Sequence, residues 1–248
     1  MDFITGEIIA IDKPLKWTSF DAVKRLRGSI QKRLRVKKFK VGHAGTLDPL
    51  ATGVLLVCTG RATRKIEELQ SGEKEYVATV ELGATTPSFD LETEIDATFP
   101  TDHIDEEMAR KALENFVGNI MQVPPAFSAV KIEGKRAYKY ARTGKDPELK
   151  AKPITIREIE FISLENNLLK FRVVCGKGTY IRALARDLGK ALGSGAHLIA
   201  LTRTRVGDFN IRDCMSIDEA VKKIAECELT FPDSYQIENN KNDINTEK

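Results

Sequence analysis

The sequence lacks any apolar run near the roughly 20 residues that a helix needs to cross a bilayer. Its first seven residues, MDFITGE, carry two acids and no basic stretch, so they do not resemble a secretory signal peptide. Hydrophobic residues make up 42% and charged residues 30% of the 248 positions, as in soluble globular proteins. We therefore expect a cytoplasmic protein without membrane association, long enough for one large domain or two small ones.

Cysteine and histidine are also scarce. The four cysteines (Cys58, Cys175, Cys214 and Cys227) lie far apart and form no CxxC pair, so we expect free thiols in a reducing compartment. The three histidines, His43, His103 and His197, are not clustered with them. A zinc site of the usual Cys and His ligands is therefore not expected.

Charge is modest in total but uneven along the chain. The net charge is +3, yet residues 24–40 hold nine Lys or Arg and no acid, whereas residues 84–109 hold eight acids and no Lys or Arg. Residues 226–248 hold six acids and two lysines. The basic block indicates either a polyanionic partner or a solvated helix face, and charge alone favours neither.

The basic block overlaps a predicted helix. Thr18 followed three residues later by Asp21 is a helix-start signal. Apolar residues then recur at helical spacing, at Val23, Leu26, Ile30 and Leu34. The basic side chains fall mostly off this stripe, facing solvent or a partner.

The remaining pattern mixes strands and helices irregularly. It predicts strands over residues 7–12, 54–58, 74–82, 127–133, 154–164, 168–175 and 199–209. It predicts helices over residues 62–70, 106–117, 135–142, 179–192 and 216–225, a turn at 165–167, a polar connection over 145–153 and a disordered tail from about 230. Irregular alternation favours a mixed sheet with helices packed against it over a doubly wound parallel fold.

The segment GHAGTLDPLATG, residues 42–53, places one carboxylate, Asp48, in a loop rich in glycine and proline before a buried strand. The loop holds no second acid and no cysteine, which argues against a metal cluster and a paired-carboxylate hydrolase. Asp48 is then a nucleophile or general base, or else a turn residue that caps backbone amides.

Other candidate residues carry two interpretations each. Tyr76 is a core aromatic or a stacking platform for a base. Arg182, with Tyr180 in the segment GTYIR, begins a helix, where the dipole disfavours a cation. It therefore has a specific carboxylate or phosphate partner, or it is an exposed Arg on a helix face. His43 is a metal ligand, a general base or a phosphate contact, and the metal is the weakest of these. The lone Trp17 is most simply a core residue.

Taken together, these segments resemble the TruB family of tRNA pseudouridine-55 synthases over about residues 5–220. GHAGTLDPLATGVL, residues 42–55, resembles the catalytic motif of that family. The other similar segments, in chain order, are IDKP (11–14), WTS (17–19), KEY (74–76), PPAFSAVK (124–131), GKRAY (134–138), AR (141–142), GTYIR (178–182), AHL (196–198) and LTRTR (201–205).

The resemblance implies a role for each matching residue. Asp48 is the nucleophile, and Tyr76 stacks on the target base. Arg182 pairs with Asp48 and holds it ionised. Tyr180 and Leu201 line the uridine pocket, and His43 supports the flipped-out RNA loop.

The implied fold is α+β: the pseudouridine synthase catalytic fold, with a mixed, mostly antiparallel central sheet flanked by helices and loops. The implied reaction converts a uridine in the T-arm loop of tRNA to pseudouridine, without cofactor, metal or ATP. The expected partner is the T-arm stem-loop of tRNA. We expect a monomer with no obligate protein partner.

We expect one catalytic domain over residues 1–225, with an RNA-gripping insertion at about 123–153 and an acidic tail over 226–248. A C-terminal RNA-binding domain of the PUA type, carried by longer family members, is not expected. Two alternatives remain open. One is a guide-RNA-dependent enzyme of the Cbf5/dyskerin type, and the other is a tRNA-binding and folding chaperone without essential catalysis.

Overall fold

In a computed structural model, the chain folds into two compact units. The first contains Met1–Ser71 and the chain from Asp208 onward, and the second is Gly72–Gly207. The structure describes residues 1–128, 131–132, 135–137, 140 and 149–230. The single-domain boundary expected from the sequence stays a prediction. None of the helices in this part of the chain has the length and apolarity that crossing a bilayer requires.

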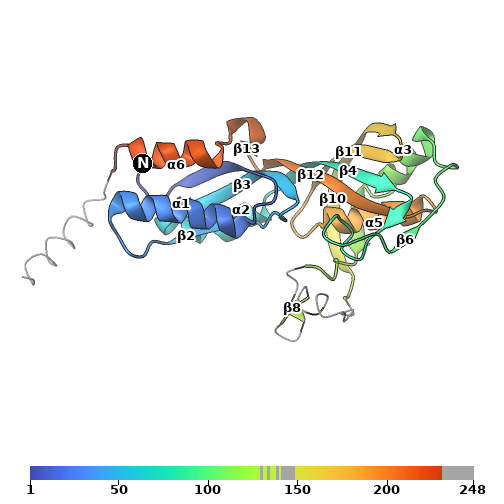
Figure 1. Ribbon diagram of the computed structural model, residues 1–248, viewed down its shortest axis with the longest axis horizontal. Helices are drawn as coiled ribbons and strands as arrows, with labels where there is room; N and C mark the ends of the chain where they lie inside the picture. The colour runs from blue at the N-terminus through green and yellow to red at the C-terminus, as the bar shows by residue number, and fades with distance from the viewer. Residues whose placement is uncertain (129–130, 133–134, 138–139, 141–148, 231–248) are drawn as a thin grey trace, which may run out of the picture. The chain divides into compact units, whose positions relative to one another are not determined.

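The first unit is built on antiparallel pairing of β3 with β1 and β2 (Figure 1). Its elements are β1 (Ile8–Lys13), α1 (Ser19–Leu34), β2 (Val41–Ala44), β3 (Ala51–Thr59), the 3₁₀ helix η1 (Gly60–Lys65), α2 (Ile66–Ser71), β13 (Phe209–Asn210), the 3₁₀ helix η2 (Ile211–Asp213) and α6 (Ile217–Glu226). The helix predicted over 62–70 is therefore two shorter ones, η1 and α2.

Both long helices of this unit begin with capping boxes. Thr18 and Asp21 close the start of α1, and Ser216 and Glu219 close the start of α6, each satisfying orphan backbone amides. These two starts confirm the sequence prediction. Arg35 ends α1 in a left-handed conformation, with φ of 57°.

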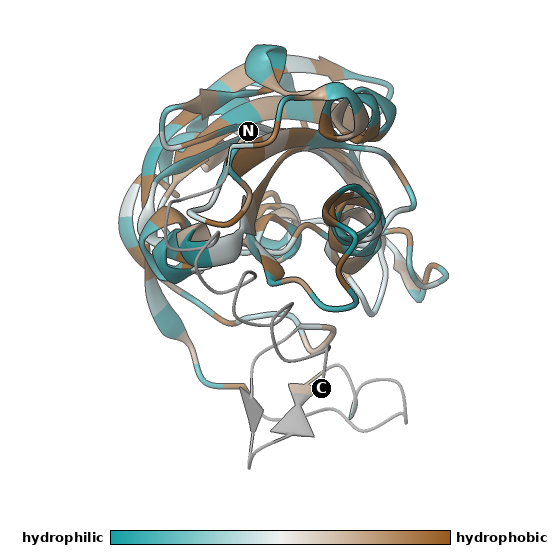
Figure 2. Cartoon of the chain, turned by 90° about the vertical axis from the view of Figure 1, so that its left-hand side faces the viewer, coloured by the Kyte–Doolittle hydropathy of each residue, from teal (hydrophilic) through white to brown (hydrophobic). Residues whose placement is uncertain are grey.

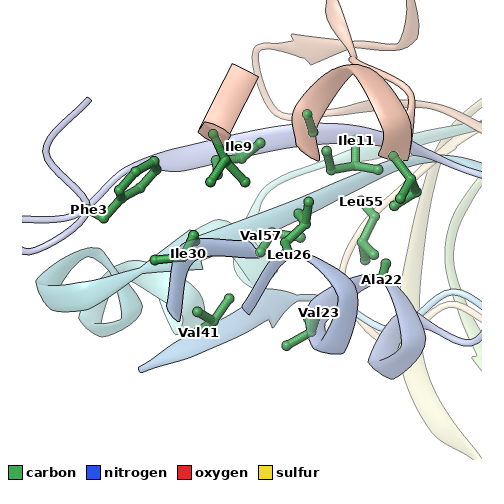
Figure 3. Packing of buried hydrophobic residues seen from close by; sticks show 13 residues of the cluster. Phe3, Ile9, Ile11, Ala22, Val23, Leu26, Ile30, Val41, Leu55 and Val57 are labelled. Carbon is green, nitrogen blue, oxygen red and sulfur yellow. The ribbon is translucent and has the colours of Figure 1, made fainter. Parts of the chain in front are cut away.

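The core of the first unit lies between its strands and these two helices. The helices α1 and α6, nearly 200 residues apart in sequence, lie side by side (Figure 1). Their buried apolar residues, among them Leu26 and Ile30 of α1 and Ile224 of α6, form one cluster with Ile11 and Val57 of the sheet. Figure 3 labels the members from α1 and the sheet. Figure 2 shows the same amphipathic pattern as alternating brown and teal along the helices.

The second unit is an antiparallel sheet in the order β12-β4-β11-β10-β7, with the helix α5 in contact with β12 and the helix α3 with β10. Its elements are β4 (Lys74–Leu82), β5 (Ala84–Thr85), β6 (Ala97–Thr98), α3 (Glu106–Glu114), β7 (Gly118–Gln122), β8 (Lys131–Ile132), β9 (Lys135–Arg136), β10 (Lys152–Glu165), β11 (Leu168–Cys175), α5 (Ile181–Ala191) and β12 (Ala196–Val206).

Two predictions of this unit follow from strict local patterns and are confirmed. The strand β4 has the predicted bounds and alternates buried and half-buried residues along its length, with Tyr76, Ala78 and Val80 on the buried face. The turn between β10 and β11 places Asn166 and Asn167 at φ of 51° and 65°, values that suit a tight hairpin and that Asn tolerates. The fold is α+β with a mostly antiparallel sheet, as expected.

Other predictions of this unit are wrong or incomplete. The strand predicted over residues 127–133 is reduced to the pair 131–132 within the described residues, and 135–136, predicted helical, is a strand that pairs with it. The two segments pair with each other as a short local hairpin, and this pairing has overridden the helix-forming tendency of the residues at 135–136. The strand β7 was not predicted, and β12 begins three residues early. The polar connection was predicted over 145–153: residues 145–148 and the tail beyond 230 lie outside the described residues, and Lys152 and Pro153 already belong to β10.

Candidate active site

The Asp48 loop connects β2 to β3 in the first unit, and a side chain from α1 fixes it. The hydroxyl of Ser19, the first residue of α1, accepts a hydrogen bond from the Leu47 amide at 2.8 Å and lies 3.1 Å from the Leu47 carbonyl, to which it donates. Ser19 and Leu47 are both buried. Both backbone groups of Leu47, the residue before Asp48, are therefore hydrogen-bonded to Ser19.

The backbone of the loop has further anchors. The Ala51 amide donates to the Asp48 carbonyl at 3.1 Å, and the Lys16 amide donates to the Pro49 carbonyl at 2.8 Å. Gly45 adopts φ of 93°, a conformation that favours glycine. The Asp48 side chain is half-buried. These constraints hold one partly accessible carboxylate on a rigid turn, which suits a reactive group.

Lys13 supports the segment that leads to this loop. Its side chain is fully buried, and its ammonium donates to the carbonyls of Pro14 at 2.9 Å and Trp17 at 2.6 Å. Burying a cation is tolerated only with such partners. His43 lies in β2 opposite Val57 of β3, two residues before the loop.

In the second unit, strand register brings Tyr76 and Leu201 to one face of the sheet. Leu201 of β12 pairs with Ala78 of β4, and Arg203 pairs with Tyr76 itself. Cross-strand partners point to the same side, and Tyr76 and Ala78 share the buried face of β4. Tyr76 is 9% exposed, and Leu201 is half-buried. The two residues are therefore neighbours.

Tyr180 is held through its backbone by Gln122 of β7. The Tyr180 amide donates to the side-chain oxygen of Gln122 at 2.9 Å, and the side-chain nitrogen of Gln122 donates back to the Tyr180 carbonyl at 3.2 Å. Gln122 is 2% exposed. Tyr180 is also the N-cap residue of α5, so this clamp fixes where the helix begins.

Arg182 is buried rather than exposed on a helix face. Its side chain is 6% exposed, and Nε lies 3.5 Å from Oδ2 of Asp90, an equally buried carboxylate. The guanidinium also donates to the carbonyls of Ser88 at 3.3 Å and Phe127 at 3.0 Å. The structure therefore supports the interpretation that Arg182 has a specific carboxylate partner, which is Asp90. The pairing with Asp48, which belongs to the other unit, stays a prediction.

The structure thus distributes the predicted residues over both units. His43 and Asp48 belong to the first, whereas Tyr76, Tyr180, Arg182 and Leu201 belong to the second. The sequence did not predict the residues that position these side chains or their segments. They are Ser19 at the Asp48 loop, Asp90 at Arg182 and Gln122 at Tyr180. Among the described residues, no three His, Cys, Asp or Glu side chains gather as a metal site requires.

Comparison with protein families identifies the chain. Residues 31–181 match the N-terminal domain of TruB family pseudouridylate synthases, and residues 182–230 match the C-terminal domain of tRNA pseudouridylate synthase B. The chain belongs to the TruB family. The segments that resembled this family in the sequence fall largely within the matched regions.

Relatives in this family are similar over most of their length. The tRNA pseudouridine synthase B of Parabacteroides distasonis is 61% identical over 219 residues, which are 88% of this chain and 93% of that protein. The protein of the same name from Flavobacterium johnsoniae is 52% identical over 217 residues, 87% of this chain and 95% of that one.

The structural comparison reaches more distant proteins. A chain in the crystal structure of a Cbf5-Nop10-Gar1 complex aligns with a TM-score of 0.67 and 32% identity, over 90% of this chain and 55% of its own. This chain is thus far more similar to the TruB proteins than to that one. The comparisons favour the TruB interpretation over the Cbf5 alternative.

Proposed function

We propose that this chain is an isomerase that converts uridine 55, in the T-arm loop of tRNA, to pseudouridine. One observation carries the proposal: the chain is 61% identical across 93% of a protein named tRNA pseudouridine synthase B. The clamped Asp48 loop supports it, since one rigid carboxylate is the group that this chemistry needs.

The reaction keeps all atoms of the uridine except one exchanged proton. The N1–C1′ bond breaks, the uracil turns, and a C5–C1′ bond forms. The C5 hydrogen leaves as a proton, and N1 gains a proton. Asp48 acts on C1′, on the uracil ring or as a base for elimination, and each route requires an ionised and immobile carboxylate.

The remaining residues bind and orient the base. A uridine must leave its stack to be reached, at a cost of a few kcal/mol. Stacking on Tyr76 offsets roughly 1–3 kcal/mol of it. Tyr180 and Leu201 line the uridine pocket, Arg182 keeps Asp48 ionised, and His43 supports the flipped-out loop. Asp90 and Gln122 are positioning residues, since they act through Arg182 and Tyr180.

The proposal includes the conditions of the reaction. The chain acts in the cytoplasm, as a monomer, without guide RNA, protein partner, metal or cofactor.

The test is release of tritium from an unmodified tRNA transcript labelled at uridine C5, with no guide RNA and with stoichiometric enzyme. We expect one equivalent per tRNA, mapped to position 55, and none with Asp48→Asn. The matched control is Asp208→Asn, the same change at an exposed residue of the first unit, which should retain wild-type release. Absence of release by the wild type would refute the proposal.

A further inference from the structure

An open groove of about 610 Å³ runs along the exposed face of α1 in the first unit. Its lining includes Lys16 and Trp17 at one end, and Lys24, Arg25, Gly28 and Lys32 along the helix. With Asp21, these positions follow one another along the helix in steps of three or four residues, so they lie on one face. This face lies away from the buried residues Ala22, Val23, Leu26 and Ile30.

The groove is cationic, and its cations form no ion pair with a carboxylate in the described part of the chain. Lys16, Lys24, Arg25 and Lys32 make no ion pair among the residues that the structure describes. The one acid of the lining, Asp21, accepts hydrogen bonds from the Thr18 amide at 3.0 Å and the Thr18 hydroxyl at 2.6 Å. These hydrogen bonds are the main reason that its pKa is lowered, and the charge of Lys24 contributes less. The charge of the groove is thus available to an anionic partner.

Gly28 lies in the middle of α1 although the fold does not require glycine there. A Cβ built at Gly28 meets nothing within 4 Å, and its φ is not in the left-handed region. Glycine inside a helix is less stable than alanine there, by roughly 1 kcal/mol. A glycine of this kind lets another backbone approach the helix closely.

The groove begins next to the Asp48 loop. The backbone amide of Lys16 donates to the carbonyl of Pro49, the residue after Asp48, at 2.8 Å. Trp17 packs partly against the core cluster and also lines the groove, so one part of its indole is fixed and another is accessible. From Asp21 to Lys32 the helix extends about 16 Å away from that end.

We propose that this groove binds the sugar–phosphate backbone of the substrate RNA on the strand that flanks the target uridine. The inference rests on the proposed function, because that function supplies an RNA whose reacting nucleotide is at Asp48. Lys24, Arg25 and Lys32 contact phosphates, Gly28 admits the strand to the helix surface, and Trp17 stacks against a ribose or base near the loop. A row of cations beside a partly accessible aromatic side chain is a usual feature of such a surface.

The first test is binding of the full chain to unmodified tRNA over a series of salt concentrations. We expect the double variant Lys24→Gln and Lys32→Gln to raise Kd about tenfold and to reduce the salt slope by about 1.4 to 1.8, since each phosphate contact contributes about 0.7–0.9. The control is Lys222→Gln with Lys223→Gln, which removes the same charge from exposed lysines of α6 in the same unit. It should change Kd less than twofold. Equal slopes in the two variants would overturn the proposal.

A second variant tests the shape of the groove at constant charge. Gly28→Leu should raise the melting temperature, because it removes a helix glycine, and weaken tRNA binding several-fold, because it fills the groove. An unchanged Kd with a raised melting temperature would show that no strand approaches Gly28, and would overturn this part of the proposal.

Tritium release separates failure of the groove from failure of the proposed function. In steady state the groove variants should raise KM about tenfold and leave kcat within twofold, since their residues lie outside the reacting site. If the wild type releases no tritium, the proposed function fails. If it does, and the groove variants match their control in KM and Kd, only the groove assignment fails.

Discussion

The cations of α1 and those on the sheet of the second unit are used in opposite ways. On the sheet, Arg172 lies 2.9 Å from both Glu75 and Glu158, and Arg205 lies 2.7 Å from Glu73. Glu75, Glu158, Arg172 and Arg205 lie in β4, β10, β11 and β12, and Glu73 directly precedes β4. In the groove on α1, by contrast, the lysines and the arginine have no carboxylate partners among the described residues.

The difference separates charges that hold strands together from charges that meet a partner. Arg172 of β11 connects three strands through its ion pairs with Glu75 of β4 and Glu158 of β10. On this surface the positive charges are therefore balanced by carboxylates of neighbouring strands. A cation without such a partner contributes little to folding and keeps its full attraction for an anion. The distinction predicts which charges a variant can lose without unfolding the protein.

The buried pair of Arg182 and Asp90 should show the largest effect on stability. We expect Asp90→Asn to lower the free energy of unfolding by about 2–3 kcal/mol, because it removes the negative charge beside a buried guanidinium. Urea unfolding followed by circular dichroism measures it. Glu106→Gln, which removes a carboxylate from an exposed pair with Arg110, should change stability by less than about 0.5 kcal/mol. If the two changes lowered the free energy of unfolding equally, burial would not explain the stability that the Asp90 pair supplies.

The sheet network predicts a smaller effect with a defined pH dependence. Burial alone would raise the pKa of Glu75, but hydrogen bonds from Thr204 and Arg172 outweigh it and lower the pKa below its ordinary 4.5. A hydrogen bond from Arg205 lowers the pKa of Glu73 in the same way. Since these folded-state values are depressed, the stability they supply is complete above about pH 5 and is lost as the pH falls through them.

Glu75→Gln should therefore cost about 1 kcal/mol near neutral pH and nearly nothing in acid, as measured by urea unfolding between about pH 3 and pH 7. Glu158→Gln is the control, since it bonds the same Arg172 but is 54% exposed, and it should cost less than half as much. A Glu75→Gln effect that does not vary with pH would rule out the network as its source.

The smallest effect belongs to the groove. The double variant Lys24→Gln and Lys32→Gln should leave the free energy of unfolding within about 0.5 kcal/mol of the wild type, although tRNA binding falls. Differential scanning calorimetry and urea unfolding of the free protein measure this. A loss above about 1 kcal/mol would mean that these lysines stabilise the fold, and the contrast between the two regions would disappear.

Local signals in the sequence were sufficient for some elements and not for others. The capping pairs at Thr18 and Ser216 act within four residues, so both helix starts were predictable. The same holds for the strict alternation of β4 and the paired asparagines of the β10–β11 turn. The short strand β7 has the sequence GNIMQ, which does not alternate polar and apolar residues. It depends on pairing with β10, which no local pattern specifies.

The candidate site divides in the same way. Motif resemblance located Asp48, Tyr76 and Arg182, but not the groups that hold them. Asp90 lies in an acidic stretch that reads as a loop, and its ion pair with Arg182 spans 92 positions in sequence. The register that sets Leu201 beside Tyr76 also depends on a β-bulge in β12, at Leu198 and Ala200. Such contacts follow from the assembled sheet, and a single sequence does not contain them.

The bond between Ser19 and Leu47 makes the Asp48 loop part of a helix terminus. Ser19 is both the first residue of α1 and the group that holds the Leu47 backbone, so fraying of the first helical turn releases the loop. The two segments should therefore open as one cooperative unit, with equal hydrogen-exchange protection at the Leu47 amide and in the first turn of α1. The stability of the first turn of α1 therefore determines how well the Asp48 loop is held in place.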